Sequence, residues 1–255
     1  MELVKVVIPI YKDSLTDKER ISLRQACKVL SSYRLVVIHP QSLNLSKLAE
    51  EFPLLTFESF EDHFFAGISG YNRLMLSSDL YQRFINCEYI LIYQLDAFVF
   101  RDELKEWCEK GYDYIGAPWL RKPIYNLPIV SSIIDLIHSY HKLKGEPSKQ
   151  ALFNKVGNGG LSLRRVQSHY RVTQDQAERI KFYISQKRHH LYNEDVFWAT
   201  EAEGFKYPEP MEAIGFSFDK YPAYCFRLNG ERLPFGCHAW YSRKMRAFWK
   251  RFIKQ

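Results

Sequence analysis

The chain has few of the features that mark disulfide-rich or zinc-stabilised proteins. Its five cysteines, Cys27, Cys87, Cys108, Cys225 and Cys237, are odd in number, scattered along the sequence and form no CxxC pair. This usage predicts reduced thiols in a cytoplasmic protein and argues against a structural zinc site.

Long hydrophobic runs are also missing. The longest candidate, LPIVSSIIDLI at residues 127–137, is too short for a membrane span and contains Asp135. The N-terminal MELVKVVIPIYK enters a strand-like run at once, without a basic region followed by a long apolar segment, so we expect no signal peptide. Any contact with the inner face of the cytoplasmic membrane is therefore expected to be peripheral.

No internal repeat, low-complexity segment or linker-like stretch divides the chain. Its 255 residues can bury a sizeable core, so one domain with appendages is expected. The 46% hydrophobic and 16% aromatic content is typical of a folded globular protein and not of a disordered one.

The positive charge is concentrated at the C-terminal end. Residues 243–255 hold six Lys and Arg and no acidic residue, and removing those six from the total of 36 leaves 30 against 29 Asp and Glu. We expect residues 241–255 to form a basic amphipathic tail helix, which could lie in an anionic membrane interface or pack its aromatic face on the domain. That face would carry Tyr241, Met245, Phe248, Trp249 and Phe252. Confinement of the charge to this tail argues against a nucleic-acid-binding module.

The first half of the chain alternates strand and helix patterns. Thr16 and Glu19 match a capping box at the start of a helix with a broad apolar face. Such alternation predicts an α/β fold with a mostly parallel sheet of the doubly wound kind, in which ligands bind beyond the carboxyl ends of the strands. Strands are predicted at residues 4–11, 34–40, 54–60, 88–100 and 112–119, and helices at 16–30, 46–52, 70–84 and 102–111.

The second half is less regular. Residues 121–156 are predicted to be a helical insertion, and residues 157–165 a glycine-rich turn followed by a strand. Helices are predicted at residues 172–188 and from residue 193, and loop with short strand at residues 207–240.

One carboxylate stands out in the first half. Asp96 lies near the end of the strongly apolar strand pattern YILIYQLDAFVF, and apolar residues resume after it. Burying an unpartnered charge costs several kcal/mol, so the sequence predicts a partner for Asp96. The alternatives to a ligand are that Asp96 caps the next helix or pairs with an arginine.

Three motifs follow one another in the order QLD at 94–96, NGGLSLR at 158–164 and NED at 193–195. With these, the chain resembles glycosyltransferases of the GT-A fold. It is most similar to a bacterial group of domains of unknown function that share VVIPIYK, GYNRLM, YILIYQLDAFVF, GYDYIGAPW, GNGGLSLR, NEDVFW and PFGCHAW. The resemblance runs from residue 6 to about residue 240, and it implies a GT-A-like, Rossmann-like domain over residues 1–240.

The resemblance implies a metal site. In GT-A enzymes a DxD motif holds a divalent cation on the diphosphate of a nucleotide-sugar donor; here Gln94 replaces the first carboxylate and Asp96 remains. Mn²⁺ or Mg²⁺ is implied, because a hard cation would neutralise the leaving group. His238, in PFGCHAW, is similar to the histidine that completes this site in several GT-A enzymes. A packed, hydrogen-bonded histidine is the alternative.

The resemblance also implies a general base. Inverting GT-A enzymes take it from the aspartate of an xED motif at a helix start, which here is Asp195, with Glu194 as its substitute. A carboxylate within hydrogen-bond reach can accept the proton of an attacking hydroxyl. The alternative is a helix N-cap with acidic residues in the first turn, which the helix dipole stabilises.

Further donor-binding residues are expected in three other motifs. Paired glycines would let the backbone approach the sugar, and an arginine suits diphosphate or base recognition through its planar fork. The alternatives are a tight turn at the paired glycines, a surface ion pair for Arg73 and core packing for Tyr11. The expected donor-binding residues are Pro9, Tyr11, Asn72, Arg73, Gln94, Asp96, Asn158, Gly159 and Gly160.

We therefore expect an enzyme, a glycosyltransferase that moves a sugar from a nucleotide-diphosphate donor to a saccharide or lipid-linked saccharide acceptor, with inversion, in bacterial surface-glycan synthesis. One alternative is a nucleotidyltransferase, which would favour a glycine-rich basic signature after the first strand that IPIYKDSLTDKE lacks. A relative that binds nucleotide sugars without transfer is the other alternative.

Overall fold

The structure, a computed structural model, describes residues 1–121, 123–144, 148–186 and 190–254. Its strands form a six-stranded sheet in the order β3-β2-β1-β4-β9-β6, a three-stranded sheet β10-β11-β5 and the pair β7-β8. The strands are β1 (Glu2–Pro9), β2 (Arg34–Pro40), β3 (Leu55–Phe60), β4 (Cys87–Tyr93), β5 (Phe98–Val99), β6 (Tyr114–Ile115), β7 (Ala117–Pro118), β8 (Val156–Gly157), β9 (Leu161–Arg165), β10 (Ser217–Phe218) and β11 (Gly236–Cys237).

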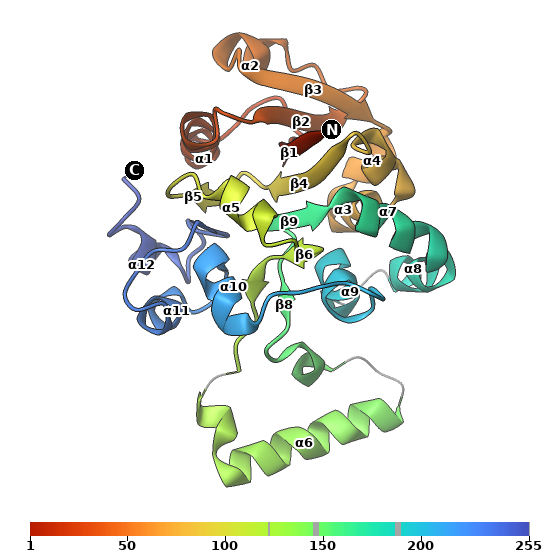
Figure 1. Cartoon of the computed structure of the whole chain (residues 1–255), viewed down its shortest axis with the longest axis vertical. Coiled ribbons are helices and arrows are strands. Elements are labelled where there is room, and N and C mark those ends of the chain that lie inside the picture. Colours follow the sequence, from red (N-terminus) through yellow and green to blue (C-terminus); the bar gives the residue numbers. More distant parts are fainter. Residues whose placement is uncertain (122, 145–147, 187–189, 255) are drawn as a thin grey trace.

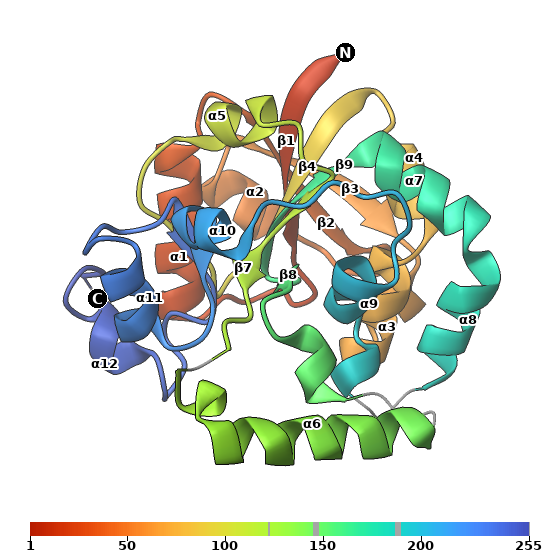
Figure 2. The same cartoon turned by 60° about the horizontal axis from the view of Figure 1, so that its bottom comes forward.

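Helices cover both faces of the central sheet (Figures 1 and 2). The α-helices are α1 (Asp17–Val29), α2 (Ser46–Glu51), α3 (Gly67–Met75), α4 (Ser78–Arg83), α5 (Leu104–Glu109), α6 (Pro128–Leu143), α7 (Val166–Asp175), α8 (Ala177–Ser185), α9 (Glu194–Thr200), α10 (Pro210–Phe216), α11 (Pro222–Leu228) and α12 (Arg246–Trp249). The described residues also form the short 3-10 helices η1 (Asp62–Phe65), η2 (Pro123–Asn126), η3 (Lys149–Leu152) and η4 (His190–Tyr192).

The central sheet is mostly parallel, which confirms the predicted fold class. Strands β3, β2, β1 and β4 run parallel, and β9 pairs antiparallel with both β4 and β6. Side chains of β1 alternate between two cores because successive strand residues point to opposite faces. Val6 and Ile8 join a cluster with Leu23 of α1, and Val7 joins a second with Leu74 of α3.

Two predicted helices are each divided in the structure. The segment predicted as one helix over 70–84 forms α3 and α4, because Ser77 stops the first helix and caps the second. Its hydroxyl donates to the Leu74 carbonyl at 2.8 Å and accepts from the Leu80 amide at 3.3 Å, as serine does at a helix N-cap. The segment predicted over 172–188 belongs to α7 and α8, which meet at Gln176, and its end at residue 188 lies outside the described residues.

Two predicted strands are also interrupted. The segment 88–100 leaves the sheet after Tyr93 and turns, with the Ala97 amide donating to the Gln94 carbonyl at 2.9 Å. Asp96 therefore lies in a turn beyond the carboxyl end of β4. The segment 112–119 breaks at Gly116, where a Cβ atom would lie only 2.3 Å from the Gly157 carbonyl oxygen.

The predicted insertion is helical in its described part. Helix α6 stands apart from the sheet at the end of the molecule opposite β3 (Figure 1), with η2 before it and η3 after it. Residues 122 and 145–147 of the insertion lie outside the described residues. Over the described ranges, no helix combines the length and apolar character that crossing a membrane requires.

The C-terminal tail differs from the helix predicted over 241–255. Its helix α12 spans only Arg246–Trp249, and its aromatic side chains pack on the domain. Trp249 is buried and stacks on Phe100 at 5.5 Å between ring centroids, while Phe248 and Phe252 contact Phe226. Of the two fates expected for the tail, the structure shows packing on the domain, because the core offers these rings an aromatic surface.

Candidate active site

A cavity of about 610 Å³ lies at the carboxyl ends of β1 and β4. Residues 9–12 enter it after β1, residues 94–96 after β4, residues 158–160 before β9, and residues 193–195 at the start of α9. The cavity brings together every predicted site residue except Arg73: Pro9, Tyr11, Asn72, Gln94, Asp96, Asn158, Gly159, Gly160, Glu194, Asp195 and His238.

Asp96 and His238 lie side by side in this cavity. The His238 Nε2 atom is 3.1 Å from the Asp96 Oδ1 atom, and its Nδ1 atom is 3.3 Å from the Asp219 Oδ1 atom. The backbone holds the same neighbours together, because the Trp240 amide donates to the Asp96 carbonyl at 3.2 Å. Burial lowers the pKa of His238, whereas the Asp219 and Asp96 carboxylates raise it, with a net value of about 10.

This cluster fits a divalent cation. The Nε2 atom of His238 is buried, lies 3.1 Å from Asp96 Oδ1 and makes no well-aligned hydrogen bond. A cation bound there would displace the proton that the two carboxylates hold on the ring through its raised pKa. Asp219 on the other ring nitrogen would fix the ring so that Nε2 faces the cation, as carboxylates do behind metal-bound histidines. Among the residues that the structure describes, no group of three or more His, Cys, Asp and Glu side chains is arranged to hold a metal. A cation here would therefore need further oxygen ligands from a bound diphosphate and water.

The charge of the cavity lining also favours a bound cation. Five carboxylates line it, whereas Lys12 and His238 are the basic side chains in its lining, and Lys12 already pairs with Glu19 at 2.8 Å. A diphosphate would meet like charges in such a cavity. A cation would relieve this repulsion. The lining carboxylates belong to Glu19, Asp96, Glu194, Asp195 and Asp219.

Glu194 has a partner behind the cavity. Its two carboxylate oxygens accept from Nη2 of Arg164 at 3.2 and 3.0 Å, and the two side chains are 2% and 0% exposed. Arg164 also donates to the Tyr81 hydroxyl at 3.0 Å and to the Ser162 hydroxyl at 3.1 Å. Burial raises the pKa of Glu194 to about 7, and the Arg164 guanidinium opposes this rise. The structure thus commits the Glu194 carboxylate to an internal ion pair.

Asp195 has a different environment. It lies at the N-terminal turn of α9, where its Oδ1 atom accepts from the Val196 amide at 2.9 Å. Burial raises the pKa of the Asp195 carboxyl, and the nearby charge of Asp219 raises it further. A carboxylate with a raised pKa is a stronger base than an ordinary aspartate, and this one faces the cavity.

The loop at Asn158–Gly160 separates these two sides of the site. A Cβ atom on Gly159 would lie 2.1 Å from Glu194 Oε1, and one on Gly160 would lie 2.1 Å from His238 Nε2. Asn158 has a φ of 113°, and its side-chain oxygen accepts from the Gly160 amide at 2.7 Å. Its Nδ2 atom is buried without a hydrogen-bond partner in a residue that lines the cavity. That atom can donate to a bound ligand.

The remaining predicted residues have varied positions. Asn72 donates to the Asn193 side chain at 3.1 Å and accepts from the Glu194 amide at 3.2 Å, so it ties α3 to the start of α9. Tyr11 is largely exposed at the cavity, where it is available to a ligand. Arg73 lies outside the lining, with Nη2 3.5 Å from Ser69 Oγ.

Sequence reasoning missed Asp219, Arg164 and the cavity contact of Tyr241. Asp219 directly follows the short strand β10, as Asp96 follows β4, so a carboxylate after an apolar run was the available signal. Arg164 is the last residue of NGGLSLR, and nothing in that motif distinguishes it from an ordinary strand residue. Tyr241 was assigned to the tail and not to the site.

Solved structures of glycosyltransferases share this fold. The chain is similar to the galactosyltransferase LgtC in complex with donor and acceptor sugar analogues, at a TM-score of 0.60 and 13% identity over 96% of this chain and 91% of LgtC. It is similar to mouse xyloside xylosyltransferase 1 at a TM-score of 0.53 and 10% identity over 93% and 97% of the two chains. The glycosyltransferase GlyE of Streptococcus pneumoniae TIGR4 matches at 0.55 and 11% over 100% and 61%. At identities this low, the structural similarity shows a shared fold and nothing more.

One family model matches the sequence of the chain. No curated protein matches the chain. The model of DUF5672, described as a protein of unknown function, matches residues 54–238 and so spans the turn at Asp96, the glycine loop, the start of α9 and His238. On that match, the chain belongs to the DUF5672 family.

Proposed function

We propose that the protein is a glycosyltransferase that moves a sugar from a nucleotide-diphosphate donor to a saccharide acceptor, free or lipid-linked, in surface-glycan synthesis. One observation carries this proposal: Asp96, His238 and Asp195, from distant parts of the chain, line one cavity at the carboxyl ends of the parallel strands of a GT-A fold. Ligands of such sheets bind at that edge.

The donor diphosphate is proposed to lie beside Asp96 and His238. Their facing atoms, Oδ1 and Nε2, would hold Mn²⁺ or Mg²⁺, with Asp219 orienting the histidine ring. When bound, the cation supplies positive charge that stabilises the departing diphosphate. Pro9, Tyr11 and Gln94 line the same cavity at the ends of β1 and β4, and they would contact the nucleotide and its phosphates.

Asp195 is proposed to accept a proton from the acceptor. As the acceptor hydroxyl oxygen bonds to the anomeric carbon, the bond from that carbon to the diphosphate oxygen breaks, and the hydroxyl proton passes to the Asp195 carboxylate. The nucleoside diphosphate leaves with the bonding electron pair. A single displacement of this kind inverts the anomeric carbon. Retention in the product, read by NMR, would remove the base role from Asp195.

Binding and turnover test the proposal separately. Isothermal titration with UDP, GDP, CMP and dTDP sugars, each with Mn²⁺, Mg²⁺ or EDTA, should reveal one donor class that binds only with a divalent cation. Asp96→Ala should abolish this binding, whereas the exposed control Asp175→Ala should not. Asp195→Asn should keep donor binding and lower sugar transfer by about 100-fold or more, within the range of general-base effects. Absence of binding by every donor would contradict the proposal.

A further inference from the structure

Helix α6 presents its apolar face to the outside of the molecule. Six side chains recur along one side of this 16-residue helix and are 41–89% exposed: Ile129, Ile133, Leu136, Ile137, Tyr140 and Leu143. We call these six residues the α6 stripe. In the described chain, eight of the sixteen large exposed apolar side chains fall within residues 124–143, so this surface is concentrated in one place.

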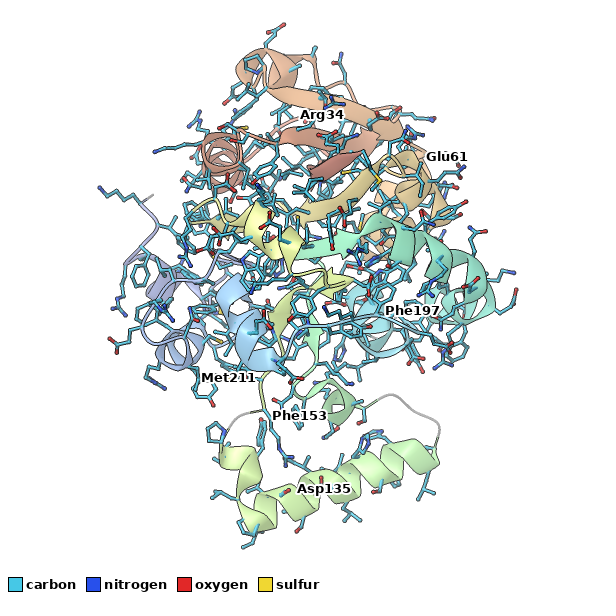
Figure 3. The ribbon with its side chains drawn as sticks, viewed as in Figure 1. Arg34, Glu61, Asp135, Phe153, Phe197 and Met211 are labelled. Carbon is cyan, nitrogen blue, oxygen red and sulfur yellow. The ribbon has the colours of Figure 1, made fainter. Side chains whose placement is uncertain are left out.

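The side of α6 that faces the protein carries the half-buried residues Val130, Ser131, Ile134 and His138. Arg121 donates to Ser131 Oγ at 3.0 Å, and His138 Nδ1 lies 2.6 Å from Ser148 Oγ. Tyr125 stacks on Phe153 at 5.6 Å. Phe153 is labelled between α6 and the body of the molecule in Figure 3, and Asp135 is labelled on the helix itself. These contacts fix the rotation of α6. A surface helix normally turns its apolar side to the core, so the outward stripe is a candidate interaction surface.

The charge of this segment favours an anionic lipid surface as the partner. Residues 121–155 contain six Lys and Arg against two acidic residues, Asp135 and Glu146. Lys144 Nζ lies 4.6 Å from the ring of Tyr140, at the edge of the stripe. Asp135 lies off the stripe and accepts from Ser131 at 3.4 Å. A second copy of this helix would bring like charges together, whereas anionic headgroups would complement them.

We infer that α6 lies in the interface of an anionic membrane, with the α6 stripe among the acyl chains and Lys144 at the headgroups. At 1.5 Å per residue, the helix would extend about 24 Å along the membrane plane. In Figure 2, β1 runs from the N-terminus toward the side of the molecule where α6 lies, so the cavity at its carboxyl end is on the membrane side. The inference concerns binding alone and holds whether or not a sugar is transferred.

Vesicle co-sedimentation tests this inference. The full chain should bind vesicles of phosphatidylglycerol and phosphatidylcholine, bind neutral phosphatidylcholine vesicles more weakly, and lose affinity for the anionic vesicles in high salt. The variant Ile133→Ser/Leu136→Ser/Tyr140→Ser should lower the partition coefficient by about tenfold or more. The matched control Leu54→Ser/Phe182→Ser/Met211→Ser removes three exposed apolar side chains elsewhere and should leave binding unchanged.

Three results would overturn the inference. The first is an absence of binding to anionic vesicles while circular dichroism shows the wild type folded. The second is a dimer, seen by sedimentation velocity, that the stripe variant dissociates without any vesicle binding by the wild type. The third is binding that survives in the stripe variant but is lost in Lys244→Glu/Lys250→Glu/Lys254→Glu, which would assign the membrane contact to the exposed charges of the tail.

Discussion

Two clusters of charge lie on opposite sides of the Gly159–Gly160 pair, and they differ in how completely they are paired. Behind Gly159, Glu194 and Arg164 are 2% and 0% exposed and form two hydrogen bonds with each other. Beside Gly160, the side chains of His238 and Asp96 are 20% and 31% exposed, and the facing ring nitrogen has no hydrogen-bond partner.

This difference separates a structural ion pair from a candidate binding site. A buried ion pair holds its place only when hydrogen bonds satisfy it, and the neighbours of Arg164 supply them. A buried ring nitrogen without a hydrogen bond is costly unless a ligand completes it. The local sequence does not distinguish the two clusters, since each joins an acidic residue to a basic one from a distant motif.

The largest effect on the difference between the two clusters is expected from substitution of Arg164. Arg164→Met should lower the free energy of unfolding at pH 8 by about 3–5 kcal/mol, because it leaves a buried carboxylate without its cation. Burial already raises the pKa of Glu194 to about 7, above its ordinary 4.5, and loss of Arg164 removes the cause that opposes this rise. Because the pKa of Glu194 is higher in the folded than in the unfolded protein, its contribution to the free energy of unfolding is fully present below pH 4.5. That contribution is lost as the pH rises through the pKa of the folded protein.

Urea unfolding from pH 4 to 9 measures this effect. The variant should lose stability with rising pH relative to wild type. The double variant Arg164→Met/Glu194→Gln, which has no carboxyl to ionise at this position, should not show the added pH dependence. A single variant as stable as wild type at pH 8 would contradict the structural role of the pair.

The second test acts on the other cluster through Asp219. Asp219→Asn should weaken Mn²⁺ binding in the presence of the nucleotide by about 10–100-fold, because the carboxylate that orients a metal-bound histidine tunes its affinity. Titration of Mn²⁺ by electron paramagnetic resonance gives the dissociation constant, and Asp175→Asn serves as the control. We expect the free energy of unfolding to change little. A variant that binds Mn²⁺ like wild type would show that His238 is oriented by other contacts.

The smallest effects are expected from the glycines, and they sharpen the comparison because the two positions are adjacent. Gly159→Ala should press on Glu194 and lower the free energy of unfolding by about 1–3 kcal/mol, as overpacking in an interior does. Gly160→Ala should press on His238 and weaken cation-dependent donor binding more than stability. Differential scanning fluorimetry and titration of each variant measure both quantities. Equal effects of the two substitutions would show that the loop responds as one unit.

Much of the fold could be predicted from local sequence. The apolar pattern of residues 34–40 corresponds to β2, and the capping box at Thr16 and Glu19 is present at the start of α1. Local patterns failed where a hydroxyl or a glycine interrupts an element. Ser77 divides a predicted helix through hydrogen bonds to Leu74 and Leu80, a cap that the apolar periodicity does not register. Gly116 divides a predicted strand because its backbone approaches Gly157, a residue distant in sequence.

The candidate site was predictable in its residues but not in their pairing. The order of the motifs pointed to Asp96, His238, Glu194 and Asp195, and the structure places all four around one cavity. Their roles as site residues remain predictions. Adjacent helix residues point in different directions, but only the docking of α9 decides that Glu194 meets Arg164 while Asp195 faces the cavity, so this division was not predictable.

The sequence by itself determined the alternation of strands and helices, because that alternation follows from short-range periodicity. It placed Asp96 within a strand over residues 88–100, and only the tertiary structure decided that this strand ends at Tyr93 and that Asp96 lies in the turn beyond it. Only the tertiary structure decided that the tail aromatics are buried and that the apolar side of α6 is exposed. Both segments are amphipathic in sequence. The direction in which an amphipathic helix faces depends on the surface available to it: the tail meets the aromatic ring of Phe226, whereas α6 is held through Ser131 and His138.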